Sequence, residues 1–152
     1  MKNIINKTLI MLSAAVLMFT TSCTKEGAET VQYLEVNASN IHGNWQLETK
    51  NGVAVEDGSF FYINFNRSGQ EFRSWDGMNS MPNTYDYSEG TFDFKYDPEL
   101  GTQIRGIDSA KEEWGDLYVI KELTKNSMVW VGVNDPTFIQ TFIRVSKIPF
   151  VK

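Results

Sequence analysis

The sequence has very little with which to carry out sulfur or imidazole chemistry. Its 152 residues include one cysteine, Cys23, and one histidine, His42. A lone cysteine excludes an intrachain disulfide, so the fold must be stabilised by packing. A lone histidine supplies neither a metal shell nor a base with a nucleophile to activate. We therefore expect no metal site, no cofactor and no enzyme, and we interpret His42 as a solvent-facing or capping residue.

Positive charge is also scarce, with 14 Lys and Arg against 19 Asp and Glu. Lys2 and Lys7 lie before Cys23 in a segment without acids, so cleavage at Cys23 would leave 12 basic and 19 acidic side chains, a formal charge of −7. Such a surface repels nucleic acid and anionic head groups, so no nucleic-acid partner is expected. Helical periodicity is lacking after Cys23, and residues 107–113 are expected to form at most a short turn.

The N-terminal segment is typical of a secretory signal. Lys2 and Lys7 precede an apolar run from Leu9 to Phe19, which is too short to span a bilayer. Small residues then lead to Cys23. This order predicts a signal peptide over residues 1–22, and the remaining 130 residues are enough for one ordinary domain.

The junction Thr20-Thr21-Ser22-Cys23 resembles a bacterial lipobox, in which the cysteine receives a diacylglycerol and becomes the new N-terminus. An aliphatic residue is more usual at the position of Thr20, so cleavage by an ordinary signal peptidase is the alternative. The resemblance implies an outer-membrane lipoprotein of the bacterial cell envelope, periplasmic or surface-exposed, held to the membrane through Cys23. Thr24-Lys25-Glu26 resembles the surface-sorting signal of lipoproteins from Bacteroides-type bacteria.

From Gly43 onward the sequence is typical of an all-β domain. Short segments rich in aromatic and β-branched residues are separated by Asn, Gly, Asp and Pro at regular spacing. The lipidated Cys and tether are expected at residues 23–40, the domain at 41–147 and a tail at 148–152. Eight strands are expected, enough to close a small barrel around side chains or one ligand. They cover Asn44–Lys50, Ser59–Asn66, Gln70–Asp76, Thr84–Tyr96, Thr102–Ile107, Trp114–Leu123, Ser127–Val133 and Phe138–Ser146.

Alternation along these strands predicts which side chains fill the interior. In residues 90–96 the aromatic side chains fall on one face and the charged ones on the other. Residues 128–133 are apolar on both faces, so the outer face should be covered by the tether, a neighbouring chain or a bound partner. The predicted interior side chains are Phe61, Ile63, Phe65, Phe72, Phe92, Phe94, Tyr96, Tyr118 and Ile120.

Several segments resemble lipocalins and their calycin relatives. Gly43-Asn44-Trp45 is similar to the Gly-x-Trp that begins the first lipocalin strand, and residues 142–145 resemble the last strand, whose arginine crosses that tryptophan. Residues 63–69 and 118–124 resemble strands of lipocalin-like lipoproteins from Bacteroides-type bacteria. The resemblance implies one up-and-down antiparallel barrel of about eight strands. Its first and last strands meet on closure, so Trp45 and Arg144 should be in contact, with a structural role that Gly43 shares.

The longer loops are expected at the opposite rim, which would be the open end of the barrel. Aromatic and flexible apolar side chains there could bind a small ligand, or they could simply plug the barrel. Arg73 alternates with Phe72, which favours a solvent-facing Arg73, whereas an inward Arg105 would need a carboxylate or an anionic ligand. The candidate ligand-binding residues are Trp75, Met78, Met81, Tyr85, Trp114 and Phe138.

Two functions follow from these observations. The first is a lipid-anchored cell-envelope protein that binds a small-molecule ligand, apolar or saccharide, at the open end of the barrel. The alternative is a non-catalytic interaction module of a cell-envelope assembly, which would bind a protein partner through an outer surface near Trp75 or Trp130. A weaker alternative is an acid-dependent hydrolase or a calcium site, although acidic loops are usually just solvated. It would use one predicted mouth loop that contains Asp108, Glu112, Glu113 and Asp116.

Overall fold

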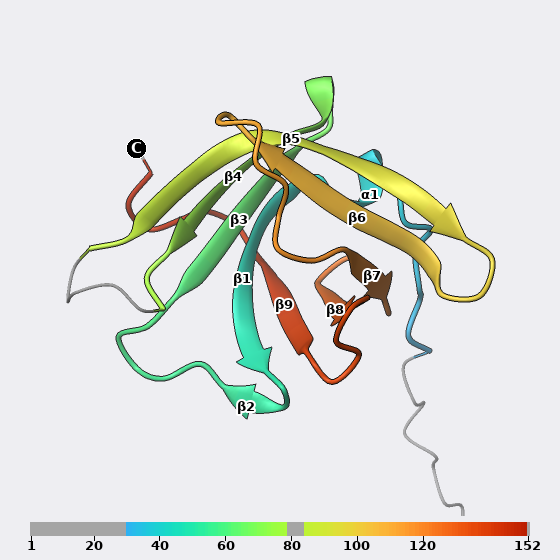
Figure 1. Ribbon diagram of the computed structural model, residues 1–152. Coiled ribbons are helices and arrows are strands. Elements are labelled where there is room, and N and C mark those ends of the chain that lie inside the picture. The colour runs from blue at the N-terminus through green and yellow to red at the C-terminus, as the bar shows by residue number, and fades with distance from the viewer. Residues whose placement is uncertain (1–29, 79–83, 152) are drawn as a thin grey trace, which may run out of the picture. The chain divides into compact units, whose positions relative to one another are not determined.

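The structure is a computed structural model that describes residues 30–78 and 84–151 (Figure 1). The predicted signal segment, Cys23 and Met81 lie outside these residues. No helix in the described part of the chain is long and apolar enough to cross a membrane. In chain order the elements are α1 (Ala38–Ile41), β1 (Gly43–Lys50), β2 (Val53–Ala54), β3 (Phe61–Asn66), the 3-10 turn η1 (Ser68–Gln70), β4 (Glu71–Asp76), β5 (Asp86–Asp97), β6 (Gly101–Asp108), β7 (Tyr118–Lys121), β8 (Ser127–Gly132) and β9 (Ile139–Val145).

The strands form a closed antiparallel barrel. The order of pairing is β1-β3-β4-β5-β6-β7-β8-β9, and β1 also pairs with β9, which closes the ring. The short strand β2 is added beside β1 through a turn in which Asn51 and Gly52 both have positive φ angles, of 52° and 76°. The prediction of an all-β, up-and-down barrel of eight strands is confirmed, and β2 is the one strand that the sequence pattern did not predict.

Strand β7 is shorter than predicted. It spans Tyr118–Lys121, and it pairs with β6 only through Gln103 and Ile104. Before β7, residues 109–111 form the expected turn. The chain then lies beside β6 through one isolated antiparallel bridge between Ile107 and Glu113 and through the main-chain N–H of Trp114, which donates to the oxygen of Gly106 at 2.9 Å. An extended but non-strand segment therefore fills the space between β6 and β7.

Arg144 closes one end of the barrel over Trp45. The two residues are register partners on β9 and β1, and the guanidinium carbon lies 4.1 Å from the centroid of the indole. Arg144 also donates hydrogen bonds to the main-chain oxygens of Asn40 at 2.8 Å, of Lys125 at 2.6 Å, and of His42. The predicted contact is confirmed, and it ties α1 and the turn before β8 to the two closing strands.

The backbone around this contact is adapted to the size of the arginine. Gly43 has a φ of +125°, and a Cβ there would lie 2.6 Å from Nη1 of Arg144. Trp45 is fully buried and donates its indole N–H to the oxygen of Ile41 at 2.8 Å. Burial lowers the pKa of Arg144, which nevertheless remains a cation because an arginine pKa is so high. His42 follows α1 as its exposed C-cap residue, and its ring nitrogen Nδ1 lies 2.8 Å from the main-chain oxygen of Phe65 on β3.

Most of the predicted interior side chains fill the barrel. Phe61, Phe94 and Tyr118 are half-buried and pack against the core cluster. The other confirmed positions are at most 5 % exposed, and they are Ile63, Phe65, Phe72, Phe92 and Ile120.

The prediction that Tyr96 points into the core is wrong, since its side chain is 71 % exposed. Tyr96 does alternate with Phe92 and Phe94 on one face of β5, but the ribbon of β5 and β6 continues beyond the ring of strands. Pairing of β5 with β4 ends at Thr91, whereas its pairing with β6 continues through Tyr96. Alternation predicts the face of a side chain, and the neighbouring strands decide whether that face is covered.

Trp75 lies on the outer face of β4, so its predicted placement at the open end is wrong. It is the register partner of Tyr62 on β3, and the two side chains are 6 % and 8 % exposed. Ile148, which follows β9, packs on both of them and is itself 4 % exposed. The chain after β9 therefore folds back over the outside of β3 and β4 (Figure 1).

We predict that Arg144→Lys lowers the free energy of unfolding by about 1–3 kcal/mol, because a lysine cannot keep the stacked, forked contacts to three main-chain oxygens. Urea unfolding of residues 24–152 measures the effect. The matched control is Arg73→Lys, since the Arg73 side chain is 57 % exposed on the outer face and its nearest carboxylate, of Glu89, is 3.8 Å away. Equal losses in the two variants would contradict the structural role of Arg144.

Candidate ligand-binding site

A cavity of about 360 Å³ opens at the end of the barrel opposite Arg144. Its lining includes Lys50 at the end of β1, Phe61 at the start of β3 and Asp76 at the end of β4, whereas Trp45 and Arg144 lie at the other ends of their strands. The volume lies at the lower end of the roughly 300–1,000 Å³ of small-molecule sites. The predicted open end is therefore the end that contains space.

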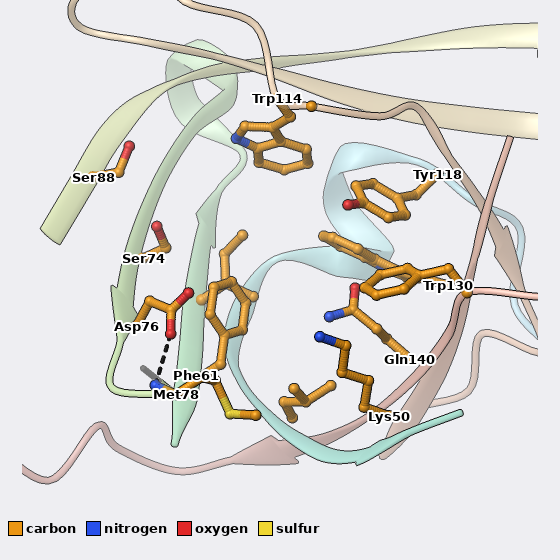
Figure 2. A pocket seen from close by; sticks show the side chains of 14 residues that line it. Lys50, Phe61, Ser74, Asp76, Met78, Ser88, Trp114, Tyr118, Trp130 and Gln140 are labelled. Carbon is orange, nitrogen blue, oxygen red and sulfur yellow. Dashed lines mark hydrogen bonds between the residues drawn. The ribbon is translucent and has the colours of Figure 1, made fainter. Parts of the chain in front are cut away.

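One wall of the cavity is aromatic (Figure 2). The ring of Trp130 lies 5.7 Å from that of Trp114 and 5.2 Å from that of Tyr118, with interplanar angles of 32° and 31°. Phe138 extends the wall toward the rim, 6.2 Å from Tyr118. Rings tilted in this way present a broad apolar surface that can cover a flat ligand.

Trp114 enters the barrel where Gly106 leaves room for it. A Cβ at Gly106 would overlap the indole of Trp114, so any larger residue would displace the ring. The indole also packs edge-on against Phe72, with centroids 5.0 Å apart. A segment that is not part of a strand thus supplies the ring that joins the core to the cavity.

The facing wall is polar and comes from β4 and β5. Ser74 and Ser88 are register partners on these strands, and Asp76 follows Ser74 two residues further along the same face. All three line the cavity in Figure 2. Oδ1 of Asp76 accepts a hydrogen bond from the N–H of Met78 at 2.8 Å, which fixes the carboxylate at the turn after β4.

Cationic and neutral polar groups lie at the rim. Nζ of Lys50 is 5.1 Å from the centroid of Phe138, a cation–π contact, and the amide of Gln140 lies beside it in the lining. Burial raises the pKa of Tyr118, and the negative charge of Asp116 raises it further. The Tyr118 hydroxyl therefore stays protonated at neutral pH and can donate a hydrogen bond.

Three of the six predicted mouth residues, Met78, Trp114 and Phe138, line the cavity. Tyr85 does not, because its ring stacks on Phe150 outside the barrel, with centroids 5.1 Å apart and an interplanar angle of 17°. Trp75 also lies on the outer face of the barrel, and Met81 is not among the residues that the structure describes. Half of the predicted mouth residues therefore line the cavity, and they are three of its eight apolar or aromatic lining residues.

The polar lining was missed, although the sequence contains a signal for it. Phe72 was expected inside, and period-two alternation then places Ser74 and Asp76 inside as well. The expectation that aromatic residues occupy the mouth favoured Trp75 over these polar residues. The same alternation identifies Ser88 on the paired strand.

The acids of the predicted catalytic loop do not form one site. Oδ1 of Asp108 accepts a hydrogen bond from the N–H of Glu112 at 2.9 Å, within the turn before β7. Asp116 instead accepts one from the side-chain amide of Asn134 at 2.7 Å, which joins two mouth loops. Within residues 30–78 and 84–151, no three His, Cys, Asp or Glu residues are grouped so that they could hold a metal ion.

Both arginines of interest lie on the outer face of the barrel. Arg73 is solvent-facing as predicted, with Glu89 as its nearest carboxylate. Arg105 forms two hydrogen bonds to Asp93, at 2.8 and 2.9 Å, and lies 3.5 Å from Glu113. The carboxylate pairs of Arg105 are thus on the surface, and neither arginine lines the cavity.

We predict that Gly106→Ala lowers the free energy of unfolding by about 1–3 kcal/mol, because the new methyl group displaces the Trp114 ring. The cost should shrink in a Trp114→Ala background, and a double-mutant cycle in urea measures that coupling. Gly115→Ala is the control, since a Cβ there meets no atom within 4 Å. An unchanged cost in the Trp114→Ala background would show that the strain lies elsewhere.

Comparison with known proteins adds no family assignment to this geometry. No protein-family model matches the chain, and no curated protein matches it in a sequence search. The structure itself is consistent with a lipocalin-like barrel, a fold that can carry many functions. The function therefore has to be argued from the site.

Proposed function

We propose that this protein is a lipid-anchored, non-catalytic binding protein of the bacterial cell envelope, related to lipocalin-like lipoproteins, and that it holds a small ligand at the open end of its barrel. The observation that carries the proposal is the cavity of about 360 Å³ between an aromatic wall and a polar wall. A concave apolar site with a few converging polar groups on a rigid scaffold is the usual form of a small-molecule site.

The distribution of side-chain size supports a cavity over a plug. Bulky side chains such as Phe65 and Phe142 fill the base of the barrel, and both are fully buried. Toward the mouth, β4 and β5 contribute Ser74 and Ser88 to the interior, and Gly115 completes the lining near Trp114. Small residues in the upper half therefore leave the space that larger ones would fill.

The alternative function, an interaction module, has less support from the same structure. Trp75 and Trp130, around which its outer surface was predicted, are only 6 % and 3 % exposed. On β8 the outward residues Val129 and Val131 are half-buried. Tyr87 beside Trp75 is 49 % exposed, but the two predicted tryptophans themselves offer a partner little accessible surface, so ligand binding is the better-supported function.

We predict that Ser88→Phe abolishes ligand binding, because the ring would fill the cavity from its polar wall. Mature protein is screened by thermal shift and tryptophan fluorescence against lipids, sterols and glycans. A ligand at 100 times its Kd should add about 2.7 kcal/mol to stability, and Ser88→Phe should remove this gain. Thr91→Phe, on the exposed outer face of the same strand, should keep it. A ligand that protects both variants equally would bind elsewhere and contradict the proposal.

We predict that Cys23→Ser releases the protein from the membrane fraction and abolishes incorporation of radiolabelled palmitate in a bacterial host. The multiple acyl chains of a lipoprotein anchor it stably, at about 0.8 kcal/mol per buried methylene, and serine cannot accept them. Lys25→Ser, in the same segment, is the control and should leave labelling unchanged. Equal labelling of wild type and Cys23→Ser would contradict lipidation and favour an ordinary signal peptidase.

A further inference from the structure

We propose that the ligand is a compact ring compound with one apolar face and one edge of hydroxyl groups, and that this edge binds to the polar wall formed by Ser74, Asp76 and Ser88. The inference rests on the proposed function and specifies its ligand. It follows from the polarity, the pairing and the charge of the side chains that β4 and β5 turn toward the cavity.

Along the cavity, β4 and β5 place aromatic side chains on the outer face and polar side chains on the inner face, the reverse of the usual pattern. Trp75 and Tyr87 are register partners on the outer face, with ring centroids 5.6 Å apart, while Ser74 and Ser88 are the partners on the inner face. At the base of the barrel the inner positions are apolar, as at Phe65 on β3, whereas Lys50 on β1 and Gln140 on β9 add polar groups to the cavity lining. Packing of the interior alone would not require polar side chains inside and aromatic side chains outside.

The polar groups are arranged as neighbours and not scattered. The side chains of cross-strand partners stand about 4.5–5.5 Å apart at Cβ, so Ser74 and Ser88 present two adjacent hydroxyls. Asp76 continues the stripe toward the rim, where Asp86 is its register partner. A ligand edge laid along this stripe meets hydroxyls first and carboxylates last.

The chemistry of these groups selects hydrogen-bond donors. A serine hydroxyl can donate or accept, but an ionised carboxylate only accepts. The two aspartates at the rim, Asp76 and Asp86, also repel an anion on this side. Hydroxyl groups match the chemistry of the whole stripe, because they can donate to a carboxylate and exchange hydrogen bonds with a serine.

The aromatic wall opposite the serines determines the chemistry of the rest of the ligand. Trp114, Tyr118 and Trp130 turn ring surface toward the cavity, opposite Ser74 and Ser88 (Figure 2). The floor is completed by aliphatic side chains, Leu47 and Ile63. A ring with an apolar face can pack on these groups while its edge reaches β4 and β5.

Isothermal titration calorimetry of the mature protein with naphthalene, 2-naphthol and 2,7-dihydroxynaphthalene tests the inference. The affinity should rise with each hydroxyl, to about tenfold for the diol over naphthalene, since each hydroxyl gains a hydrogen bond that naphthalene cannot make. Ser74→Ala and Asp76→Asn should each weaken the diol several-fold and leave the Kd of naphthalene within twofold. Glu89→Gln makes the same carboxylate-to-amide change on the outer face and should alter neither Kd.

The outcomes separate this inference from the proposed function. Equal Kd values for naphthalene and the diol, or equal losses for both probes in Ser74→Ala and Asp76→Asn, would overturn the hydroxylated edge while leaving a binding cavity in place. Failure of all three probes would also overturn it if another compound protects the wild type and not Ser88→Phe. If no compound protects the wild type, the proposed function falls together with the inference. Thermal unfolding of each variant shows that it is folded.

Discussion

The guanidinium of Arg144 is the interaction on which the rest of the barrel depends. It covers Trp45 at 4.1 Å and joins main-chain oxygens from the segment around α1 and from the turn before β8. Because these groups precede β1 and β8 and Arg144 itself lies on β9, one side chain joins the strands where the ring closes and covers its base. Gly43 is the matching backbone feature, since a side chain there would collide with Nη1. The contacts of Arg144 stabilise the closed end of the barrel and involve no residue at the open end.

A base closed in this way allows the opposite end to remain open. The fully buried rings of Phe65, Phe72 and Phe142 lie below the cavity, and Trp114 joins that packed region to the cavity wall because Gly106 admits it. Empty space in a core costs stability through lost contacts. Here the space lies at a solvent-open rim, where water can occupy it, so the cavity does not carry the full cost of a buried void.

Much of the fold could be predicted from the sequence, because the determining signals are local. Alternation places Ile63 and Phe92 correctly, and the Gly43-Asn44-Trp45 segment with Arg144 predicts how the ring closes. Alternation with Phe72 also places Trp75 on the outer face, but it predicts neither the burial of Trp75 there nor the exposure of Tyr96. Their burial depends on where neighbouring strands stop and on the packing of residues after β9, and both are properties of distant chain segments. Three of the apolar lining residues were found because they lie in or beside the predicted mouth loops, whereas finding the polar lining required giving alternation precedence over hydrophobicity.

The inverted stretch of β4 and β5 links the fold to the proposed function. Placing Trp75 outside exposes apolar surface unless something covers it, and the chain supplies Ile148 for that purpose, with Phe150 packed against the neighbouring Tyr62. The burial of Trp75 under this segment stabilises the fold by about 25 cal/mol per Å² of apolar surface. This gain offsets the apolar contacts that the interior lacks at Ser74. Turning the aromatic residue inward would achieve the same burial without a covering segment. Packing alone therefore does not require the polar interior, and the proposed ligand recognition would account for it.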